Sequence, residues 1–357
     1  MRAGMYVGVR KLAVREVPAP EPGPGEVQIA VEAAGICGSD LHGYRNASPE
    51  RLAQLMQGPA RGHELAGRVV ALGEGVTSVR VGDRVGIEPL CGCGACPWCE
   101  AGDYHLCPRL EHIGGARSGG FAELTVAPAD KVFPLPDHVS TEEAALLDCL
   151  AVAVHALRRV PVHFEHRVLV VGAATIGLST LQCARLMSPR WLGVVGRYPE
   201  HLALAREFGA DAVYDVDDPG WAARMTEETG GGADVVFETV GGGPGPLQTA
   251  VAGLAPGGTI GVVGGFPSIE VPMRTLMRKE ATLAFCWSYC RWGRTPEYRI
   301  ALDLLARGRL RAKEMITHRL PLDAIDEAFR LAADKKSSRA IKVLILPQAR
   351  AAGGRPA

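Results

Sequence analysis

Four closely spaced cysteines carry the densest chemical signal in the chain. They lie in CGCGACPWCEAGDYHLC, residues 91–107, with the spacing Cys93-x2-Cys96-x2-Cys99-x7-Cys107. Thiolates are good zinc ligands, and a closed tetrahedral site of four cysteines is structural. The short x2 loops let backbone N–H groups point at the sulfur atoms. The spacing therefore predicts a structural zinc lobe at about residues 89–110, which Cys93 fits better than Cys91.

Other uses of these thiols stay open. A [4Fe–4S] site has the bacterial motif C-x2-C-x2-C followed by C-P, and Cys107 is followed by Pro108. The x7 gap before Cys107 is longer than the usual x3, so zinc is favoured. Reduced thiols without a metal are a further alternative. Disulfides are disfavoured because we expect a cytoplasmic protein, in which thiols are kept reduced.

A second set of metal-type residues is spread over three segments: GICGSDLH (35–42), ARGHELAG (60–67) and LLDCL (146–150). Cys37, His63 and Glu64 could all bind zinc, and the third segment adds Asp148 or Cys149. A Cys/His/carboxylate set with one position open for water or substrate is what catalytic zinc requires. Each signal is weak alone, but their combination predicts a catalytic metal site.

A glycine-containing loop predicts a dinucleotide site. GAATIG, residues 172–177, follows the apolar run RVLVV and precedes a segment with helical periodicity, which is the context for a pyrophosphate at a helix N-terminus. The expected contacts are Gly172, Ala174, Thr175, Ile176 and Gly177. The second glycine of the usual G-x-G-x-x-G pattern is Ala174 here, and its extra methyl group predicts a slightly looser approach.

The end of the next expected strand bears on the choice of cofactor. In NAD-binding sites this position carries an acid that bonds the ribose 2′-OH and repels a 2′-phosphate. Here it is Gly196, followed by Arg197, whose guanidinium could bind a phosphate. We therefore expect NADP(H) to be preferred over NAD(H). The alternatives are that Arg197 is only solvated or stacks on the adenine of NAD.

Composition and charge exclude some classes of function. The 357 residues hold 39 Lys and Arg against 39 Asp and Glu, so the basic excess needed to bind nucleic acid or an anionic membrane is missing. No apolar run reaches the roughly 18 residues of a membrane-spanning helix. The N-terminal MRAGMYVGVRKLAVREV has no uninterrupted apolar core of a signal peptide. We expect a cytoplasmic protein without nucleic-acid or membrane partners.

The elements that must position these residues change type along the chain. Short β-rich runs fill the first 150 residues, and Ser140 with Glu143 then signals the capped start of a helix. From residue 167 strands and helices alternate, which predicts a doubly wound parallel sheet. Two helical patterns and the strand AIKVLIL follow residue 296. We expect an α/β protein with a β-rich domain at 1–152, a Rossmann domain at 153–290 and a return to the first domain at 291–357.

Taken together, GICGSDLH, GHELAG, the cysteine lobe and the glycine loop occur in an order that resembles the zinc-dependent medium-chain dehydrogenase/reductase family. Alcohol, sorbitol and threonine dehydrogenases belong to this family. The resemblance runs from VREVPAPEPGPGEVQI to AIKVLIL. It implies a GroES-like catalytic domain, a Rossmann domain, two zinc ions per subunit, one catalytic and one structural, and a homodimer or homotetramer.

The resemblance also implies a ligand set for the catalytic zinc. Cys37 and His63 are ligands, and Glu64 is a ligand in some states or an outer carboxylate that exchanges with water. The fourth position aligns with Asp148, where the polyol and threonine branches carry an acid. Simple alcohol dehydrogenases have cysteine there, so Cys149 remains the alternative.

Further roles follow from the same resemblance. Asp40 resembles the carboxylate that fixes the tautomer of the ligand histidine, and Ser39 and His42 resemble a proton relay. Ser39 and Asp40 could instead cap a helix, and His42 could be a surface residue. Backbone groups at Val240, Val263 and Gly264, which end expected strands, would hold the nicotinamide carboxamide, unless these loops are only turns.

The function implied is a reversible hydride transfer between a nicotinamide cofactor and a secondary alcohol, polyol or amino alcohol. Substrate-pocket candidates are Tyr44, Arg45 and Asn46, together with Trp287 and Tyr289, although the aromatic ones could equally be core or a subunit contact. Two other functions stay open: an iron–sulfur or zinc-module protein for electron transfer or scaffolding, and a zinc-free quinone or enoyl reductase on the same fold.

Overall fold

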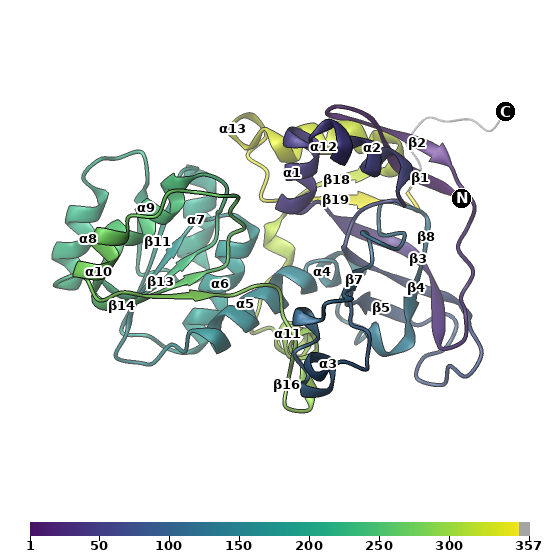
Figure 1. Ribbon diagram of the computed structural model, residues 1–357, viewed down its shortest axis with the longest axis horizontal. Coiled ribbons are helices and arrows are strands. Elements are labelled where there is room, and N and C mark those ends of the chain that lie inside the picture. Colours follow the sequence, from purple (N-terminus) through teal and green to yellow (C-terminus); the bar gives the residue numbers. More distant parts are fainter. Residues whose placement is uncertain (350–357) are drawn as a thin grey trace. The chain divides into compact units, whose positions relative to one another are not determined.

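The computed structural model describes residues 1–349, so residues 350–357 of the expected return segment lie outside the described residues. The chain forms two compact units. Unit 1 contains Met1–Asp148 and the segment from Cys290 onward, and unit 2 is Cys149–Tyr289. Figure 1 labels their helices and strands. Within residues 1–349, no helix is both long and apolar enough to cross a membrane.

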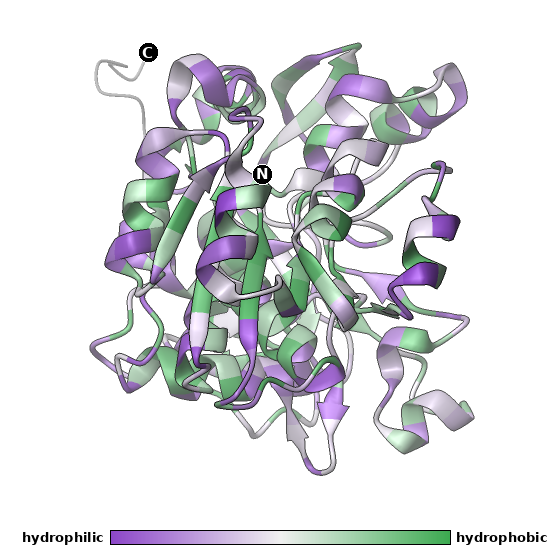
Figure 2. Ribbon diagram, turned by 90° about the vertical axis from the view of Figure 1, so that its left-hand side faces the viewer, coloured by the Kyte–Doolittle hydropathy of each residue, from purple (hydrophilic) through white to green (hydrophobic). Residues whose placement is uncertain are grey.

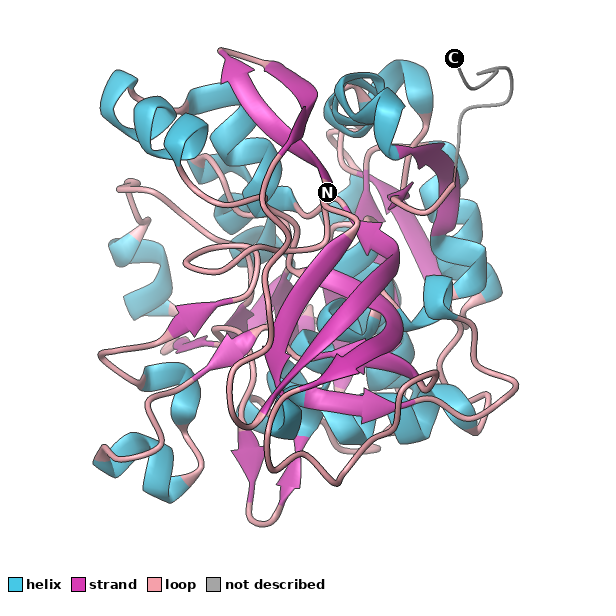
Figure 3. Ribbon diagram, turned by 90° about the vertical axis from the view of Figure 1, so that its right-hand side faces the viewer, coloured by secondary structure: helices cyan, strands magenta, loops and turns pink. Residues whose placement is uncertain are grey.

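Unit 1 is built on a seven-stranded sheet with the order β18-β19-β3-β4-β5-β9, in which β8 also pairs with β3. Figure 3 shows these strands in magenta. All pairs are antiparallel except β18 with β19. The strands are β3 (Glu26–Gly35), β4 (Glu64–Leu72), β5 (Arg84–Ile87), β8 (Leu124–Pro128), β9 (Val132–Pro134), β18 (Ile316–Pro321) and β19 (Lys342–Leu346).

The remaining elements of unit 1 are short. β1 and β2 form a hairpin, and two further two-stranded sheets pair β6 with β7 and β16 with β17. Their bounds are β1 (Arg2–Gly8), β2 (Lys11–Glu16), β6 (Leu90–Cys91), β7 (Glu111–His112), β16 (Arg291–Trp292) and β17 (Thr295–Pro296). The helices are α1 (Gly38–Asn46), α2 (Pro49–Gln57), α3 (Pro97–Ala101), α4 (Thr141–Ala144), α11 (Glu297–Ala306), α12 (Ile325–Ala333) and α13 (Lys335–Ser338).

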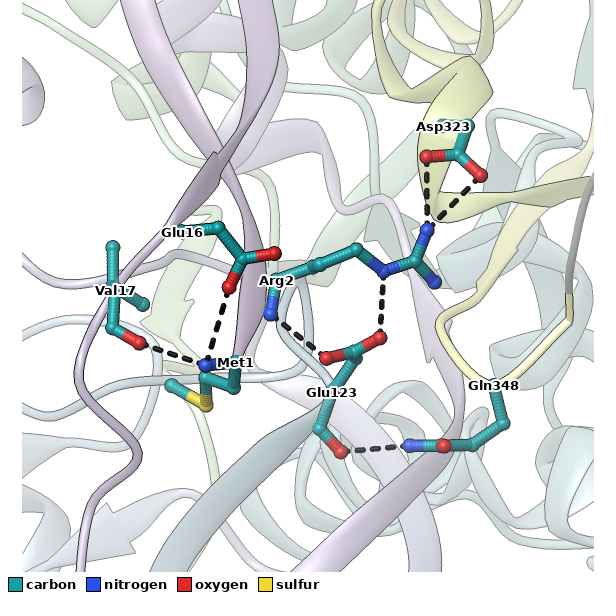
Figure 4. A network of polar contacts seen from close by, with 7 residues as sticks. All are labelled: Met1, Arg2, Glu16, Val17, Glu123, Asp323 and Gln348. Carbon is teal, nitrogen blue, oxygen red and sulfur yellow. Dashed lines mark hydrogen bonds and ion pairs between the residues drawn. The ribbon is translucent and has the colours of Figure 1, made fainter. Parts of the chain in front are cut away.

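The return of the chain to unit 1 is fixed by packing and by a polar network. α12 contributes Phe329 to the core, where its ring meets those of Tyr6, Tyr44 and Phe121. Figure 4 shows how the Arg2 side chain joins Glu123 and Asp323, with Nε–Oε1 at 2.7 Å and Nη1–Oδ1 at 3.0 Å. Gln348 donates a hydrogen bond to the backbone oxygen of Glu123. Residues more than 300 positions apart are thereby held together.

Unit 2 is a doubly wound α/β domain. Its six parallel strands have the order β12-β11-β10-β13-β14-β15, which is the Rossmann order with the switch point beside β10. Figure 2 shows green, hydrophobic residues along the strands, as expected for strands buried on both faces. The strands are β10 (Arg167–Val171), β11 (Trp191–Gly196), β12 (Ala212–Asp215), β13 (Ala233–Glu238), β14 (Leu254–Val262) and β15 (Thr282–Phe285). The helices are α6 (Thr175–Leu186), α7 (Pro199–Glu207), α8 (Trp221–Thr229), α9 (Pro244–Gly253) and α10 (Met273–Arg278).

The fold class expected from the sequence is confirmed, with two differences in detail. The edge strand β15 was not predicted, because the alternation of strands and helices was expected to end near residue 265. The helix expected to run on from Ser140 is split into α4 and α5 (Leu147–Arg159). Its predicted capping box is confirmed, because Glu143 accepts from the Ser140 N–H at 3.1 Å while Ser140 Oγ accepts from the Glu143 N–H at 3.2 Å.

Candidate active site and metal centres

Strand pairing in unit 1 brings together two motifs that the sequence separates. β3 and β4 are antiparallel, with Gly35 opposite Glu64, so the chain reaches Cys37 just after β3 and His63 just before β4. Donor atoms of Cys37, His63 and Glu64 all lie within 4.8 Å of one another. Since zinc–ligand bonds are roughly 2.0–2.3 Å long, atoms so placed can share one ion.

The charges around His63 favour a cation at this place. Burial alone would lower the pKa of His63, but the charge of Cys37 and a hydrogen bond to it, with the charges of Asp40 and Asp148, raise that pKa well above its usual value. Several groups that can carry negative charge, among them Cys37, Asp40 and Asp148, thus surround one imidazole. The donor set fits a divalent cation, and zinc in particular, because it combines sulfur, nitrogen and oxygen.

Asp148 lies at the start of α5, and one of its oxygens is within 4.8 Å of an oxygen of Glu64. This position suits a fourth ligand. Cys149 is the next residue and its side chain is buried. The preference for Asp148 over Cys149 as a ligand stays a prediction.

Lys342 is a member of this cluster that the sequence did not reveal. Its Nζ lies 2.5 Å from Oε2 of Glu64 and donates to the backbone oxygen of Ile36 at 3.2 Å. Both side chains are almost fully buried, at 3% and 0% exposure. A signal was available, since Lys342 is the one charged residue in the apolar run AIKVLIL. The pair restrains Glu64, because a carboxylate held by a buried ammonium cannot move freely.

Asp40 is buried in the first turn of α1. Its Oδ2 accepts a hydrogen bond from the N–H of Cys37 at 3.0 Å. Burial raises the pKa of Asp40, although the positive charge of His63 opposes the rise. The carboxylate therefore serves as a helix cap, and it is also close enough to His63 to act on it. Its expected role in orienting His63 stays a prediction.

Ser39 and His42 are exposed on α1 and line one pocket of about 380 Å³. This pocket lies within unit 1 and is also lined by Asn46, Arg51 and Arg61. Of the proposed substrate contacts on α1, Asn46 borders the pocket, whereas Tyr44 is buried against Phe329 with ring centroids 5.4 Å apart. The two arginines had not been singled out from the sequence.

The four cysteines of the lobe converge. Donor atoms of Cys93, Cys96, Cys99 and Cys107 lie within 4.8 Å of one another, and the Cys93 and Cys99 sulfurs are 4.0 Å apart. Four thiolates bound at about 2.3 Å to one tetrahedral ion stand about 3.8 Å apart, so the spacing fits a single zinc ion. None of these four cysteines forms a disulfide, and neither does any other cysteine within residues 1–349.

Backbone groups support thiolates in this lobe. The N–H groups of Cys93 and Arg109 point at the Cys107 sulfur at 3.4 and 3.3 Å. A hydrogen bond from the backbone of Ala95 lowers the pKa of Cys93 to about 6, whereas burial raises that of Cys99 to about 11. A bound cation is what would ionise all four, which agrees with a structural metal.

In unit 2, the glycine loop joins β10 to the N-terminus of α6. Gly172 has φ +105°, and a Cβ there would come within 2.6 Å of the Val240 side chain, so only glycine fits. Ala174 is the N-cap with φ −89°, which any residue adopts, and its side chain does not cap the helix. Thr175, Ile176 and Gly177 form the first turn, and a Cβ on Gly177 would collide with the Gly172 oxygen. This geometry suits a pyrophosphate, and the substitution by Ala174 causes no strain.

The other expected cofactor contacts lie at the carboxyl edge of the same sheet. Gly196 ends β11, and Arg197 is exposed with its Nε 3.2 Å from Oδ2 of Asp217. Val240, Val263 and Gly264 lie around buried Glu238: Val240 donates to its Oε1 at 2.7 Å, and Val263 and Gly264 donate to its backbone oxygen. Glu238 therefore fixes the shape of both loops, which the sequence alone did not show.

Comparison with known proteins places this geometry in a family. Residues 23–137 match the alcohol dehydrogenase GroES-like domain, and residues 175–307 match the zinc-binding dehydrogenase domain. A sorbitol dehydrogenase of Arabidopsis thaliana is 34% identical over 96% of this chain and 94% of its own length. The crystal structure of galactitol-1-phosphate dehydrogenase from Escherichia coli has a TM-score of 0.86 at 29% identity, covering 97% of this chain and 100% of that one. A putative zinc-binding dehydrogenase from Sinorhizobium meliloti, bound to NADP, gives 0.83 at 29% identity, covering 97% and 99%. The chain thus belongs to the zinc-dependent medium-chain dehydrogenase/reductase family and is an alcohol or polyol dehydrogenase.

Proposed function

We propose that this enzyme oxidises a secondary hydroxyl group of a polyol or amino alcohol to the ketone, and reverses this reaction, with bound zinc and a nicotinamide cofactor. The observation that carries the proposal is the convergence of Cys37, His63 and Glu64 within 4.8 Å. Asp148 would be the acidic ligand, and an acid at this position favours polyols over simple primary alcohols.

The roles follow from the chemistry of each side chain. Cys37, His63 and Asp148 would hold the catalytic zinc, with Glu64 as a ligand or as an outer carboxylate that Lys342 restrains. When bound, zinc is a Lewis acid that lowers the pKa of a hydroxyl group. Ser39 Oγ would take the hydroxyl proton and pass it to His42, which is exposed and can release it to solvent. The hydrogen on the carbinol carbon would leave as hydride to the nicotinamide ring.

The second zinc and the cofactor preference belong to the same proposal. Cys93, Cys96, Cys99 and Cys107 would hold a structural zinc, and NADP(H) would be preferred over NAD(H) because Arg197 lies where an acid would exclude the 2′-phosphate. We also propose a homodimer or homotetramer, as in the family, which light scattering during size-exclusion chromatography can measure.

Metal analysis combined with an activity screen tests the reaction. We expect two zinc ions per chain, no iron, and oxidation of sorbitol or a related polyol followed by nicotinamide absorbance. Cys37→Ser and His63→Ala should lose activity and one zinc, while Cys99→Ser should lose the other. Full activity of Cys37→Ser would overturn the proposal. A purified protein that is coloured and contains iron would favour the electron-transfer alternative.

The Arg197–Asp217 pair offers a matched test of the cofactor preference. Arg197→Gln should raise the KM for NADP by about tenfold, as expected from the loss of a hydrogen bond to a charged group, and leave the KM for NAD nearly unchanged. Asp217→Asn keeps the guanidinium and removes its competitor, so it should lower the KM for NADP. Equal changes for both cofactors in Arg197→Gln would remove the phosphate argument.

A further inference from the structure

The pocket beside the relay residues has a charge that oxidation of a neutral polyol does not need. Arg51, on α2, and Arg61, just before β4, both line it with Ser39 and His42. Its volume of about 380 Å³ is within the roughly 300–1,000 Å³ of small-molecule sites. Asp40 is the one acidic residue in the lining, and its carboxylate is buried and bonded to the Cys37 N–H.

Neither guanidinium is neutralised. Arg51 donates to Oε1 of Gln54 at 3.1 Å, and Arg61 donates to the backbone oxygen of Gly115 at 3.3 Å. Both partners are uncharged, and among residues 1–349 no carboxylate lies within ion-pair distance of either arginine. Arg51 is exposed, whereas Arg61 is partly buried. A partly buried guanidinium without a counter-ion is costly, so an anion supplied from outside would stabilise Arg61, and Arg51 at the same pocket adds a second positive charge.

The two arginines are close to each other and to the reacting end of the site. Both arginines line the same pocket as Ser39 and Asp40. The Tyr6 hydroxyl donates a hydrogen bond to the backbone oxygen of Asp40 at 3.2 Å. Burial raises the pKa of this hydroxyl, while the positive charges of Arg61 and Arg51 both act to lower it. Arg61 also stands two residues before His63 in the chain, and Asp40, which lines the pocket, accepts a hydrogen bond from the N–H of Cys37 at 3.0 Å. One ligand could therefore reach from the pocket to the metal cluster.

We propose that the substrate is a polyol that carries a phosphate monoester, with Arg51 and Arg61 binding the phosphate and Ser39 at the hydroxyl that is oxidised. This inference rests on the proposed function and narrows its substrate class. Two guanidiniums match the nearly two negative charges of a phosphate monoester better than the single charge of a carboxylate. Asn46 and His42 also line the pocket. They can form hydrogen bonds with the substrate hydroxyl groups that lie between the phosphate and the carbon that is oxidised.

Kinetics with matched substrates tests the proposal. For the zinc-loaded enzyme we expect kcat/KM for sorbitol 6-phosphate to exceed that for sorbitol by at least tenfold. Arg51→Gln and Arg61→Gln should each reduce this ratio by roughly 10–100-fold, the range for a lost hydrogen bond to a charged group. Arg80→Gln, which removes an exposed arginine outside the pocket, should leave the ratio unchanged. Arg61→Lys should recover part of it.

Binding measured by titration calorimetry separates this proposal from the reaction itself. Sorbitol 6-phosphate should bind the full-length protein more tightly than sorbitol, with affinity that falls in Arg51→Gln and Arg61→Gln and with rising salt. Binding of this kind without turnover would support the phosphate site and contradict the proposed reaction. Equal affinity for the two compounds, unchanged selectivity in both variants, or a stronger preference for L-idonate, which carries a carboxylate, would overturn the phosphate assignment.

Discussion

At the residue scale, the buried ion pair between Glu64 and Lys342 predicts a large effect on stability. Lys342→Met would leave the Glu64 carboxylate without its ammonium partner, and breaking a buried pair costs about 3–5 kcal/mol. We expect the free energy of unfolding, measured by urea denaturation, to fall by this amount. Zinc content should be measured on the same samples, because Glu64 lies in the metal cluster.

The double variant Lys342→Met/Glu64→Gln supplies the control for this prediction. It removes both charges, so most of the lost stability should return. If the double variant is as unstable as the sum of the two single ones, the residues act independently and Glu64 is not restrained by Lys342.

At this scale the sequence predicts ligands better than it predicts their supports. Cys37 and His63 stand in short motifs whose residue types already indicate chemistry. Lys342 is 278 positions from Glu64, and only the placement of β19 next to β3 makes them neighbours. Arg51 and Arg61 could not be predicted either, because an arginine beside a motif is usually a solvated surface residue. Only the pocket that they share distinguishes them from other surface arginines.

Among the elements, α4 depends on its capping box. Ser140 Oγ accepts from the Glu143 N–H and donates to the Glu143 carboxylate at 2.6 Å. Since α4 has only four residues, its ends dominate its stability. Ser140→Ala should lower the free energy of unfolding by about 1 kcal/mol, measured in urea. Ser78→Ala, in an exposed loop, should change it by less than about 0.5 kcal/mol, and equal effects would contradict a role for the cap.

An ion pair at the start of β10 predicts a dependence on pH. The Arg167 guanidinium lies 2.6 Å and 2.9 Å from the two carboxylate oxygens of Asp234, and its hydrogen bonds hold the pKa of Asp234 below the usual value. A carboxyl whose pKa is lowered on folding stabilises the protein above its unfolded pKa of about 3.9, and this stabilisation is lost as pH falls. Asp234→Asn should cost about 1–2 kcal/mol at pH 7, as chemical denaturation would show. The difference from wild type should shrink toward pH 3, and a constant difference would contradict the assignment.

The elements themselves were largely predictable, and their limits were less so. The βα units of unit 2 show in the sequence because each strand is a continuous apolar run followed by a helical period. β15 was missed because it lies beyond residue 265, where the alternation was expected to end, and the break between α4 and α5 has no proline or glycine to mark it.

For the whole molecule, the sequence indicates two domains but not how the first one closes. Unit 1 is assembled from segments at both ends of the chain, and its sheet is completed where β19 pairs with β3 through Leu344 and Gly35. At another place, Arg2 near the N-terminus forms ion pairs with Glu123 and with Asp323 of the returning segment (Figure 4). The helical patterns and the strand AIKVLIL after residue 296 predicted the return of the chain, but these contacts have no local pattern, so the residues that fix the return could not be predicted.

At the scale of the whole molecule, unit 2 is held together by an apolar core, whereas we expect the cysteine lobe to be held together by a metal ion. Removal of the metal should reveal this difference. Unit 2 has its own apolar core around Leu169, Val236 and Ile260. In the cysteine lobe, none of the residues of α3 is buried, so that helix is not held by an apolar core. A strong chelator should therefore loosen the lobe first, because the four thiols lose their common ion while the sheet cores remain intact.

Trypsin can report this loosening, because Arg109 is exposed within the lobe and is followed by Leu110. We expect cleavage after Arg109, identified by mass spectrometry, to be slow with metal and fast after chelation. Cys99→Ser should be cut quickly even with zinc present, and Arg109→Gln should abolish this cut without altering cleavage elsewhere. If the chelated enzyme is cut first within unit 2, or resists trypsin as well as the metal-loaded form, the lobe is held by packing rather than by a metal. The Cys37→Ser variant completes the comparison: it should lose catalytic zinc and activity but stay resistant at Arg109, because its defect lies at the other metal site.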